Sequence, residues 1–253
     1  IEGLSLNSYL ASGVPGTVKG MFKAHNLFGS IPIENLIAPA IKIAKDGFTL
    51  SNFQATNFNK YKKKFLNGSD SESIFIKEGG FKEGDIFIQA DLAKSLELIQ
   101  SRGQKVFYEG KLADKIVEDF SQNGGLISSE DLFNYKVYLK DPICGIYKEY
   151  DVCSMPLPSS GGIAIIQMLN IIENFDLKNY SHNSLEYIEL LMKIMSFAYA
   201  DRSKYLGDQE FFDAPVENLI SKKYAEKISK KIKSSKELKV EPGIYFYEGD
   251  QTT

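Results

Sequence analysis

Apolar residues recur at helical spacing in several parts of the chain. Leu92, Leu96 and Ile99 follow one another at i, i+4 and i+7, so a helix is expected over residues 91–102, with Gly103 at its end. The same reasoning predicts three further helices: one that holds Pro39 in its first turn and ends at Gly47, one over residues 112–120, and a short one that Ser128 and Asp131 cap.

The longest helix is expected to begin at Ser184. Five apolar residues then recur at spacings of three and four, namely Leu185, Ile188, Met192, Met195 and Tyr199. A stripe of this kind usually faces the interior of a protein. We therefore predict that it packs into the core.

A β-hairpin is expected over residues 142–155, with Lys148-Glu149 as a two-residue turn. Counting outward from Tyr147 and Tyr150 places Cys144 opposite Cys153. In this register the cysteines form a non-hydrogen-bonded pair, whose Cα atoms lie about 4.5 Å apart, just inside the range for a disulfide. A reduced pair is the alternative, because Glu149 is a poor turn residue and a bulge would shift the register.

Residues 155–162, Met-Pro-Leu-Pro-Ser-Ser-Gly-Gly, join this hairpin to an apolar segment. The serines are suited to cap a following helix, and the glycines allow another backbone to come close. Neither serine lies in a G-x-S-x-G frame, and no Gly-Lys-Ser or Gly-Lys-Thr is present to bind phosphate. From its residues alone, the segment is expected to be structural.

Composition narrows the possible functions. The chain has 253 residues, of which 43% are hydrophobic and 25% charged, as is typical of a globular protein. A net charge of -3 provides no strong positive field, so nucleic acid is not expected as a partner. The most apolar run, residues 163–172, is shorter than the roughly 20 residues that cross a bilayer and is broken by Gln167 and Asn170, so no transmembrane segment is expected.

Metal and cofactor chemistry has little support in the sequence. The cysteines and the two histidines, His25 and His182, lie too far apart to form a local zinc motif, so no metal and no cofactor is expected. Residues 229–241 carry Lys and Glu without helical periodicity and are followed by Pro242-Gly243, which predicts a mobile linker.

A set of short segments resembles the γ-glutamyltranspeptidase (glutathione hydrolase) family, in matching order and over nearly the whole chain. The segments are GVPGTV at 13–18, PAI at 39–41, QADLA at 89–93, FYEG at 107–110, GG at 124–125, PLPSSGG at 156–162, and AYADR at 198–202 followed by GD at 207–208. Two positions depart from the family. Leu157 stands where proline is usual, and Glu149 replaces the usual glycine of the hairpin turn.

The resemblance implies a helix-rich α/β (α+β) chain that is part of an αββα four-layer N-terminal-nucleophile hydrolase fold and is incomplete at both ends. Residues 1–253 would be a single partial domain, the large-subunit portion of a precursor, with residues 229–251 as the mobile linker before the autocleavage site. The precursor is expected to cut itself between Gln251 and Thr252. Thr252 would then be the first residue of the small subunit.

The implied activity is that of a γ-glutamyltransferase or glutathione hydrolase with Thr252 as its catalytic nucleophile. Such an enzyme cleaves the γ-glutamyl amide bond of glutathione and related compounds and passes the group to water or to an amino acid or peptide. The family's substrate-binding arginine and oxyanion donors lie outside this chain, so no substrate-binding residue is assigned and the chain alone is expected to be inactive. The implied partner is the small subunit, and the implied location is periplasmic or extracellular.

Other interpretations stay open. A cephalosporin or glutaryl acylase, or a poly-γ-glutamate-processing relative, would use the same scaffold, and a non-catalytic scaffold fragment belongs to a different class altogether. His25, His182 and the pair Asp201-Arg202 are interpreted as structural, the pair as a helix-end ion pair or cap.

Overall fold

The computed structural model describes residues 4, 8–65, 74–234 and 240–242. The chain divides into two compact units, residues 1–138 (unit 1) and 139–253 (unit 2), and each is described by itself. The single partial domain that the sequence predicts stays a prediction. Among the described residues, no helix is both long and apolar enough to cross a membrane.

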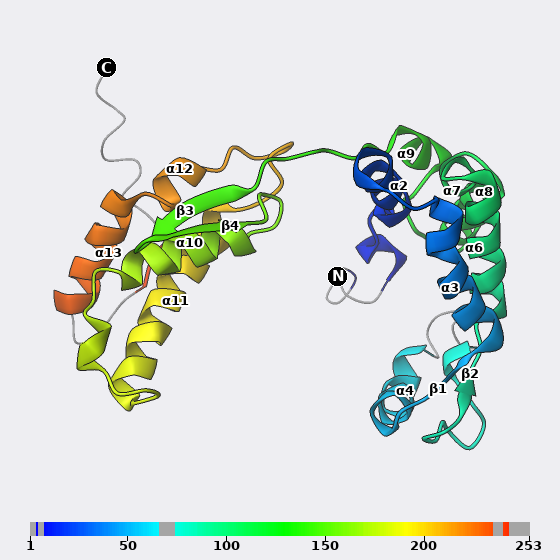
Figure 1. The fold of residues 1–253 in the computed structure, drawn as a ribbon, viewed down its shortest axis with the longest axis horizontal. Coiled ribbons are helices and arrows are strands. Elements are labelled where there is room, and N and C mark those ends of the chain that lie inside the picture. Colours follow the sequence, from blue (N-terminus) through cyan, green and yellow to red (C-terminus); the bar gives the residue numbers. More distant parts are fainter. Residues whose placement is uncertain (1–3, 5–7, 66–73, 235–239, 243–253) are drawn as a thin grey trace. The chain divides into compact units, whose positions relative to one another are not determined.

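Unit 1 is mainly helical (Figure 1). Helices α3 and α6 pack along each other, and β1 and β2 form a short antiparallel pair in which Phe48 lies opposite Phe87. A small core around Tyr108 and Leu132 lies among α7, α8 and α9. The elements are η1 (Tyr9–Ala11), α2 (Thr17–Phe28), α3 (Ile33–Asp46), β1 (Phe48–Thr49), α4 (Asn52–Phe65), β2 (Ile86–Phe87), α6 (Ala90–Arg102), α7 (Lys105–Tyr108), α8 (Lys111–Gln122) and α9 (Ser129–Asn134).

Most of the predicted helices of unit 1 are confirmed. Helix α6 ends at Gly103, whose φ of 70° is the left-handed conformation that favours glycine. Helix α9 begins with a full capping box, in which the Ser128 side chain accepts from the backbone N–H of Asp131 and the Asp131 side chain accepts from that of Ser128. Helix α8 covers the expected residues 112–120.

The predicted start of α3 is wrong. The helix begins at Ile33, so Pro39 lies inside it rather than in its first turn. A proline removes one helical hydrogen bond. The helix continues through this position with Ile41 and Ala44 buried after it, and it ends at Gly47 as expected.

Unit 2 is built around one helix, α10, which packs against α11, α13 and both strands of the hairpin (Figure 1). Helix α10 is buried on several sides. Its buried apolar residues are Ile163, Ala164, Ile166, Ile171 and Ile172. The elements are β3 (Ile143–Tyr147), β4 (Tyr150–Ser154), α10 (Gly161–Ile172), η2 (Leu177–Asn179), α11 (Leu185–Tyr205), α12 (Val216–Leu219) and α13 (Lys222–Ser234).

The hairpin has the predicted register. Tyr147 pairs with Tyr150 and Cys144 with Cys153, and the two cysteines form a disulfide with a Cα–Cα distance of 4.1 Å. The unusual turn residue is Lys148 rather than Glu149, because Lys148 has a φ of 53°. The turn therefore forms in the expected place without a glycine.

The predicted linker begins too early. Residues 229–234 form the last turns of α13, in which Ser229 and Ile232 are buried. The periodicity becomes visible when the window starts at Tyr224, because Tyr224, Ile228 and Ile232 recur every four residues. Apart from residues 240–242, the rest of the expected linker lies outside the described residues.

Helix α11 begins after Ser184 as predicted, with the Ser184 side chain accepting from the N–H of Tyr187. The predicted burial of its stripe is wrong, because all five stripe residues are exposed. Their exposed fractions are Leu185 77%, Ile188 43%, Met192 63%, Met195 45% and Tyr199 51%. A different face of α11, with Leu190, Ile194 and Phe197, packs into the core of unit 2.

Candidate functional site

The expected nucleophile and cleavage site, Thr252 and Gln251, lie outside the described residues. The described part of the chain instead places the family-like segments in space. Within each unit, segments that are far apart in the sequence meet in pairs.

In unit 1 the segment at 13–18 meets the segment at 107–110. The buried Tyr108 hydroxyl donates to the carbonyl oxygen of Pro15 at 2.7 Å and accepts from the N–H of Lys19 at 3.1 Å. Burial of the ring raises the pKa of the Tyr108 hydroxyl, so it remains a donor at neutral pH. Gly16 lies against the Tyr135 ring, where a Cβ atom would overlap the hydroxyl oxygen.

In unit 2 the segment at 156–162 meets the segment at 198–202. Gly162 brings the start of α10 against the end of β4, where a Cβ atom would collide with the carbonyl oxygen of Met155. This contact confirms the expected close approach of two backbones. Ser160 occupies the N-cap position but makes no side-chain capping bond; its Oγ accepts from Arg202 Nε at 2.7 Å.

Asp201 does not form the expected helix-end pair with Arg202. The residue is 1% exposed, and its carboxylate accepts two hydrogen bonds of 2.6 Å, from Gln167 Nε2 and from the Tyr224 hydroxyl. These bonds connect α10, α11 and α13 through a single buried group. A buried carboxylate is costly unless it is hydrogen-bonded, so the network restricts how the three helices can pack.

Sequence reasoning missed this network, although a signal was present. Gln167 and Asn170 interrupt the most apolar segment of the chain three residues apart, and polar residues on an apolar helix need partners. Asn170 finds one in the carbonyl oxygen of Ile220, which accepts from its Nδ2 at 2.5 Å. The partners lie 34 and 50 residues away, a distance that no local pattern shows.

Glu173, which follows α10, connects the hairpin to α13. Its Oε1 accepts from the backbone N–H of Lys148 at 2.6 Å, and its Oε2 pairs with the Lys222 ammonium group. Lys222 also donates to the carbonyl oxygen of Ile146. The hydrogen bond from Lys222 and the one from the Lys148 backbone hold the pKa of the Glu173 carboxyl below its usual range.

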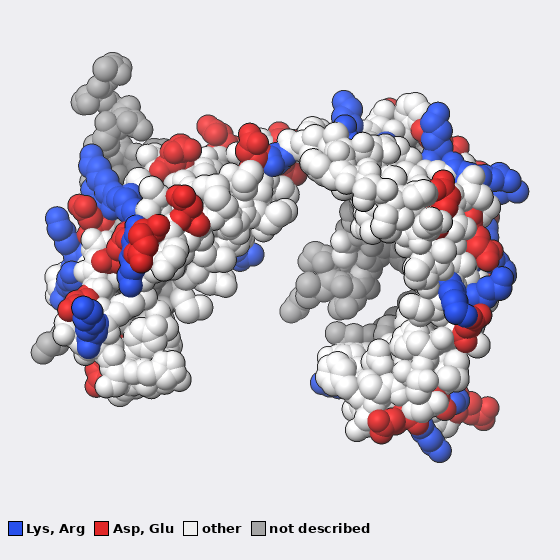
Figure 2. Space-filling view, in the orientation of Figure 1, with Lys and Arg blue, Asp and Glu red and all other residues white. Residues whose placement is uncertain are grey.

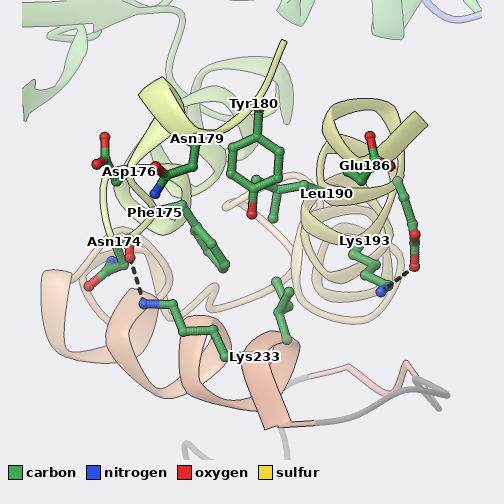
Figure 3. A pocket seen from close by; sticks show the side chains of 11 residues that line it. Asn174, Phe175, Asp176, Asn179, Tyr180, Glu186, Leu190, Lys193 and Lys233 are labelled. Atoms are coloured by element: carbon green, nitrogen blue, oxygen red, sulfur yellow. Dashed lines mark hydrogen bonds and ion pairs between the residues drawn. The ribbon is translucent and has the colours of Figure 1, made fainter. Parts of the chain in front are cut away.

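A cavity of about 540 Å³ lies between the η2 region, α11 and α13 (Figure 3). Both of its lysines are engaged: Lys193 lies 2.5 Å from Glu189, and Lys233 donates to the carbonyl oxygen of Asn174 at 2.7 Å. Its described lining contains no Ser, Thr or Cys that would serve as a nucleophile. We assign no catalytic role to this cavity.

The histidines lie apart from these networks. His25 Nε2 contacts the carbonyl oxygen of Ile31 at 2.7 Å near the end of α2, and His182 is exposed before α11. No group of three His, Cys, Asp or Glu residues that would hold a metal ion occurs in the part of the chain that the structure describes. On the face shown in Figure 2, acidic and basic side chains are interspersed over both units.

Known proteins resemble this arrangement closely. The crystal structure of *Helicobacter pylori* gamma-glutamyltranspeptidase matches with a TM-score of 0.93 and 40% identity, over 100% of this chain and 74% of that chain. The structure of *Bacillus anthracis* transpeptidase enzyme CapD matches with a TM-score of 0.72 and 34% identity, over 85% of this chain and 72% of that one. These likenesses define the class: the chain has the helix-rich part of an N-terminal-nucleophile hydrolase fold.

Sequence similarity identifies the family to which the chain belongs. Residues 2–253 match the gamma-glutamyltranspeptidase family, and the chain is 44% identical over 255 residues to the glutathione hydrolase proenzyme of *Escherichia coli* (strain K12). The chain belongs to the gamma-glutamyltranspeptidase family. That alignment covers 98% of this chain and 44% of the *E. coli* protein, so the chain spans less than half the length of this relative.

Proposed function

We propose that this chain is the large-subunit part of a γ-glutamyltransferase or glutathione hydrolase precursor. The observation that carries the proposal is the match over residues 2–253, together with 44% identity to a glutathione hydrolase proenzyme. The enzyme would cleave the γ-glutamyl amide bond of glutathione and related compounds. The acyl group would pass through a γ-glutamyl ester on Thr252 to water or to an amino-acid or peptide acceptor.

The chemistry of Thr252 supports this role. A threonine hydroxyl is a weak nucleophile until a base removes its proton, and an α-amino group with a pKa of about 7.7 to 8.0 is suited to this task on the same residue. In the uncut precursor the nitrogen of Thr252 belongs to a peptide bond and is not basic. Cleavage between Gln251 and Thr252 would therefore create the general base and the active enzyme together.

The cleavage itself would use the same hydroxyl. Thr252 Oγ1 attacks the carbonyl carbon of Gln251, the acyl group moves from nitrogen to oxygen, and the nitrogen takes up a proton. Water then hydrolyses the ester, which releases the carboxylate of Gln251 and restores the hydroxyl of Thr252 beside the amino group that the shift has freed. The polypeptide that begins at Thr252 would remain bound as the small subunit.

Variants of the full-length precursor test the assignment. Thr252→Ala should leave one uncut, inactive chain, whereas Thr252→Ser should still cut because it keeps the hydroxyl. Thr253→Ala is the matched control and should retain cutting, since its side chain is not the attacking group. N-terminal sequencing of the small subunit should give Thr252 first; another first residue, or normal cutting of Thr252→Ala, would overturn the assignment.

The substrate is tested separately from the cleavage. The acylase ACY 1 proenzyme of *Pseudomonas* sp. (strain V22) is 35% identical over 217 residues, against 44% for the glutathione hydrolase proenzyme of *E. coli*. The mature protein should release glutamate from glutathione faster than it cleaves a glutaryl amide or poly-γ-glutamate. Faster cleavage of either of the latter would assign it to that alternative, and no cleavage at all would favour a non-catalytic scaffold.

We also propose a periplasmic or extracellular location. The exposed disulfide between Cys144 and Cys153 supports an oxidising compartment, because exposed disulfides are rare where cellular thiols are reducing. Mass spectrometry of protein purified without reductant should find these cysteines bonded. Recovery of the protein from the cytosolic fraction with both thiols free would count against this proposal.

A further inference from the structure

Helix α11 has two apolar faces. The first packs into the core of unit 2 and contains the buried residues Leu190, Ile194, Phe197, Ala198 and Tyr205. The second is the stripe of Leu185, Ile188, Met192, Met195 and Tyr199, here called the outer face. At about 100° of rotation per residue, the outer face covers an arc of about 80° beside the packed one.

The charged residues of α11 occupy the part of the helix circumference that the two apolar faces leave free. Glu186, Glu189, Lys193 and Lys204 lie on the side opposite the boundary between the two apolar faces. Arg202 borders the outer face, with its guanidinium 5.8 Å from the centre of the Tyr199 ring. A surface helix normally has one apolar stripe, whereas a helix that lies between two packed layers needs two.

The outer face is large and continuous. Its five residues follow the 3-4-3-4 spacing that places side chains in one line, over about 21 Å of helix. Single apolar residues on a surface need no explanation, but an uninterrupted line of large ones marks a contact surface. No described residue of unit 2 buries it, since each of its members remains at least 43% exposed.

We infer that the outer face of α11 binds the polypeptide that follows Thr253 in the precursor, and that apolar side chains of that polypeptide cover it. This inference rests on the proposed function, under which that polypeptide is the small subunit. The chain covers only 44% of the *E. coli* proenzyme and 45% of the relative from *Pseudomonas* sp. (strain A14), so more than half of each relative's length lies outside the matched part, and the proposed function assigns the segment beyond Thr253 to the small subunit. No acidic or basic residue of α11 falls within the arc that the outer face covers, which favours an apolar partner surface over a charged one.

Site-specific photocrosslinking in the full-length protein tests the contact. A benzophenone amino acid replaces Met195 in one variant and Met192 in another, so that one misfolded variant does not decide the outcome. The control places it at Lys204, on the charged side of the same helix. After irradiation, mass spectrometry of the digested protein identifies the crosslinked peptides.

We expect positions 195 and 192 to crosslink to peptides from beyond residue 253, several-fold more strongly than position 204. Crosslinks confined to residues 1–253, crosslinks to peptides from before residue 1, crosslinks between two copies of this chain, or yields equal to the control would each overturn the inference. The readout does not depend on catalysis. Crosslinking without glutathione hydrolysis would leave the contact standing and reject the proposed activity, while hydrolysis without such crosslinks would do the reverse.

Discussion

At the scale of single residues, two adjacent glycines at the start of α10 have opposite requirements. A Cβ atom at Gly162 would collide with the carbonyl oxygen of Met155 and press on Ile143, whereas one at Gly161 would lie 3.7 Å from Ser159 Oγ, an ordinary contact. We predict that Gly162→Ala lowers the free energy of unfolding by about 1–3 kcal/mol, because the backbone cannot move aside.

The matched control is Gly161→Ala, which should be neutral or slightly stabilising because alanine favours the helix. Denaturant unfolding of the two variants in the full-length protein measures the difference. Equal effects of the two substitutions would contradict the close packing of α10 on the hairpin.

The hydrogen bond from Tyr224 to Asp201 gives a second prediction. Tyr224→Phe removes a hydroxyl donor from a buried carboxylate, and such bonds to charged groups contribute about 1.5–3 kcal/mol. Thermal unfolding should show a loss of this order. Tyr187→Phe serves as the control and should change little, because this residue is half-buried and its hydroxyl makes no hydrogen bond among the described residues.

Residue-level features differ in how far the sequence reveals them. The cap at Ser128, the glycine at 103 and the register of Cys144 and Cys153 follow from local rules, because their partners lie within ten residues. The bonds of Asp201 do not, because Gln167 and Tyr224 come near it only after three helices have packed. The position of Thr252 came from the family resemblance, since two threonines alone carry no signal.

At the scale of elements, Glu173 connects the hairpin turn to the start of α13 and makes stability depend on pH. The pKa of the Glu173 carboxyl is lower in the folded protein than in the unfolded chain, where it is about 4.3. The carboxylate therefore contributes fully to the free energy of unfolding above about pH 4.3, and this contribution is lost as the pH falls through the folded pKa. Glu173→Gln should therefore destabilise the protein at pH 7. The difference from wild type should shrink as the pH falls below about 4.

Asp46 provides the comparison. Its pKa is also lowered, by Lys42 one helical turn away, but this pair is exposed and connects no other element. Asp46→Asn should thus have a smaller effect at pH 7. A pH-independent difference between Glu173→Gln and wild type, measured by thermal unfolding across this range, would show that the carboxylate charge is not what stabilises the connection.

Helices were predicted correctly where the apolar periodicity and the residues that cap or end a helix indicated the same boundaries. Helices α6, α8, α9 and α11 have apolar periodicity together with a glycine or a cap at one end. The start of α3 was predicted too late because Pro39 was placed in a first turn. In the structure the helix begins at Ile33 and continues through Pro39 to the buried residues Ile41 and Ala44, although the proline removes one helical hydrogen bond. The end of α13 was not predicted, because lysines separate the few apolar residues of its narrow buried face along the sequence.

At the scale of the whole molecule, large apolar side chains are exposed on both units of this chain. Examples outside α11 are Phe28 at 82%, Phe53 at 76% and Phe211 at 87%. We predict that the 253-residue chain, expressed without the rest of the precursor, self-associates as its concentration rises. Sedimentation velocity measures this directly.

Two variants of the isolated chain make the test specific. Met192→Lys with Met195→Lys should reduce association because it places charge within the outer face. Ser196→Lys with Ala200→Lys adds the same charge toward the polar side of α11 and should reduce it less. A chain that stays monomeric without any substitution would contradict the prediction.

The exposure of the outer face of α11 was not predicted from the sequence. Periodicity identifies an apolar face but not the molecule that covers it, and the stripe was assigned to the core of a chain that spans less than half of its *E. coli* relative. The ordered set of short motifs predicted the class of fold through the family resemblance, and two pairs of these segments meet in the structure although they lie far apart in the sequence. It did not show which surfaces remain open when only this part is present.

The two methionines of the outer face also make α11 sensitive to oxidants. Met192 and Met195 expose 63% and 45% of their surface, and peroxide converts an accessible thioether into a polar sulfoxide. Oxidation before assembly would place polar groups in an apolar contact and weaken it, whereas assembly first would shield both sulfur atoms. The order in which the precursor meets an oxidant and completes its assembly would then determine how much intact protein forms.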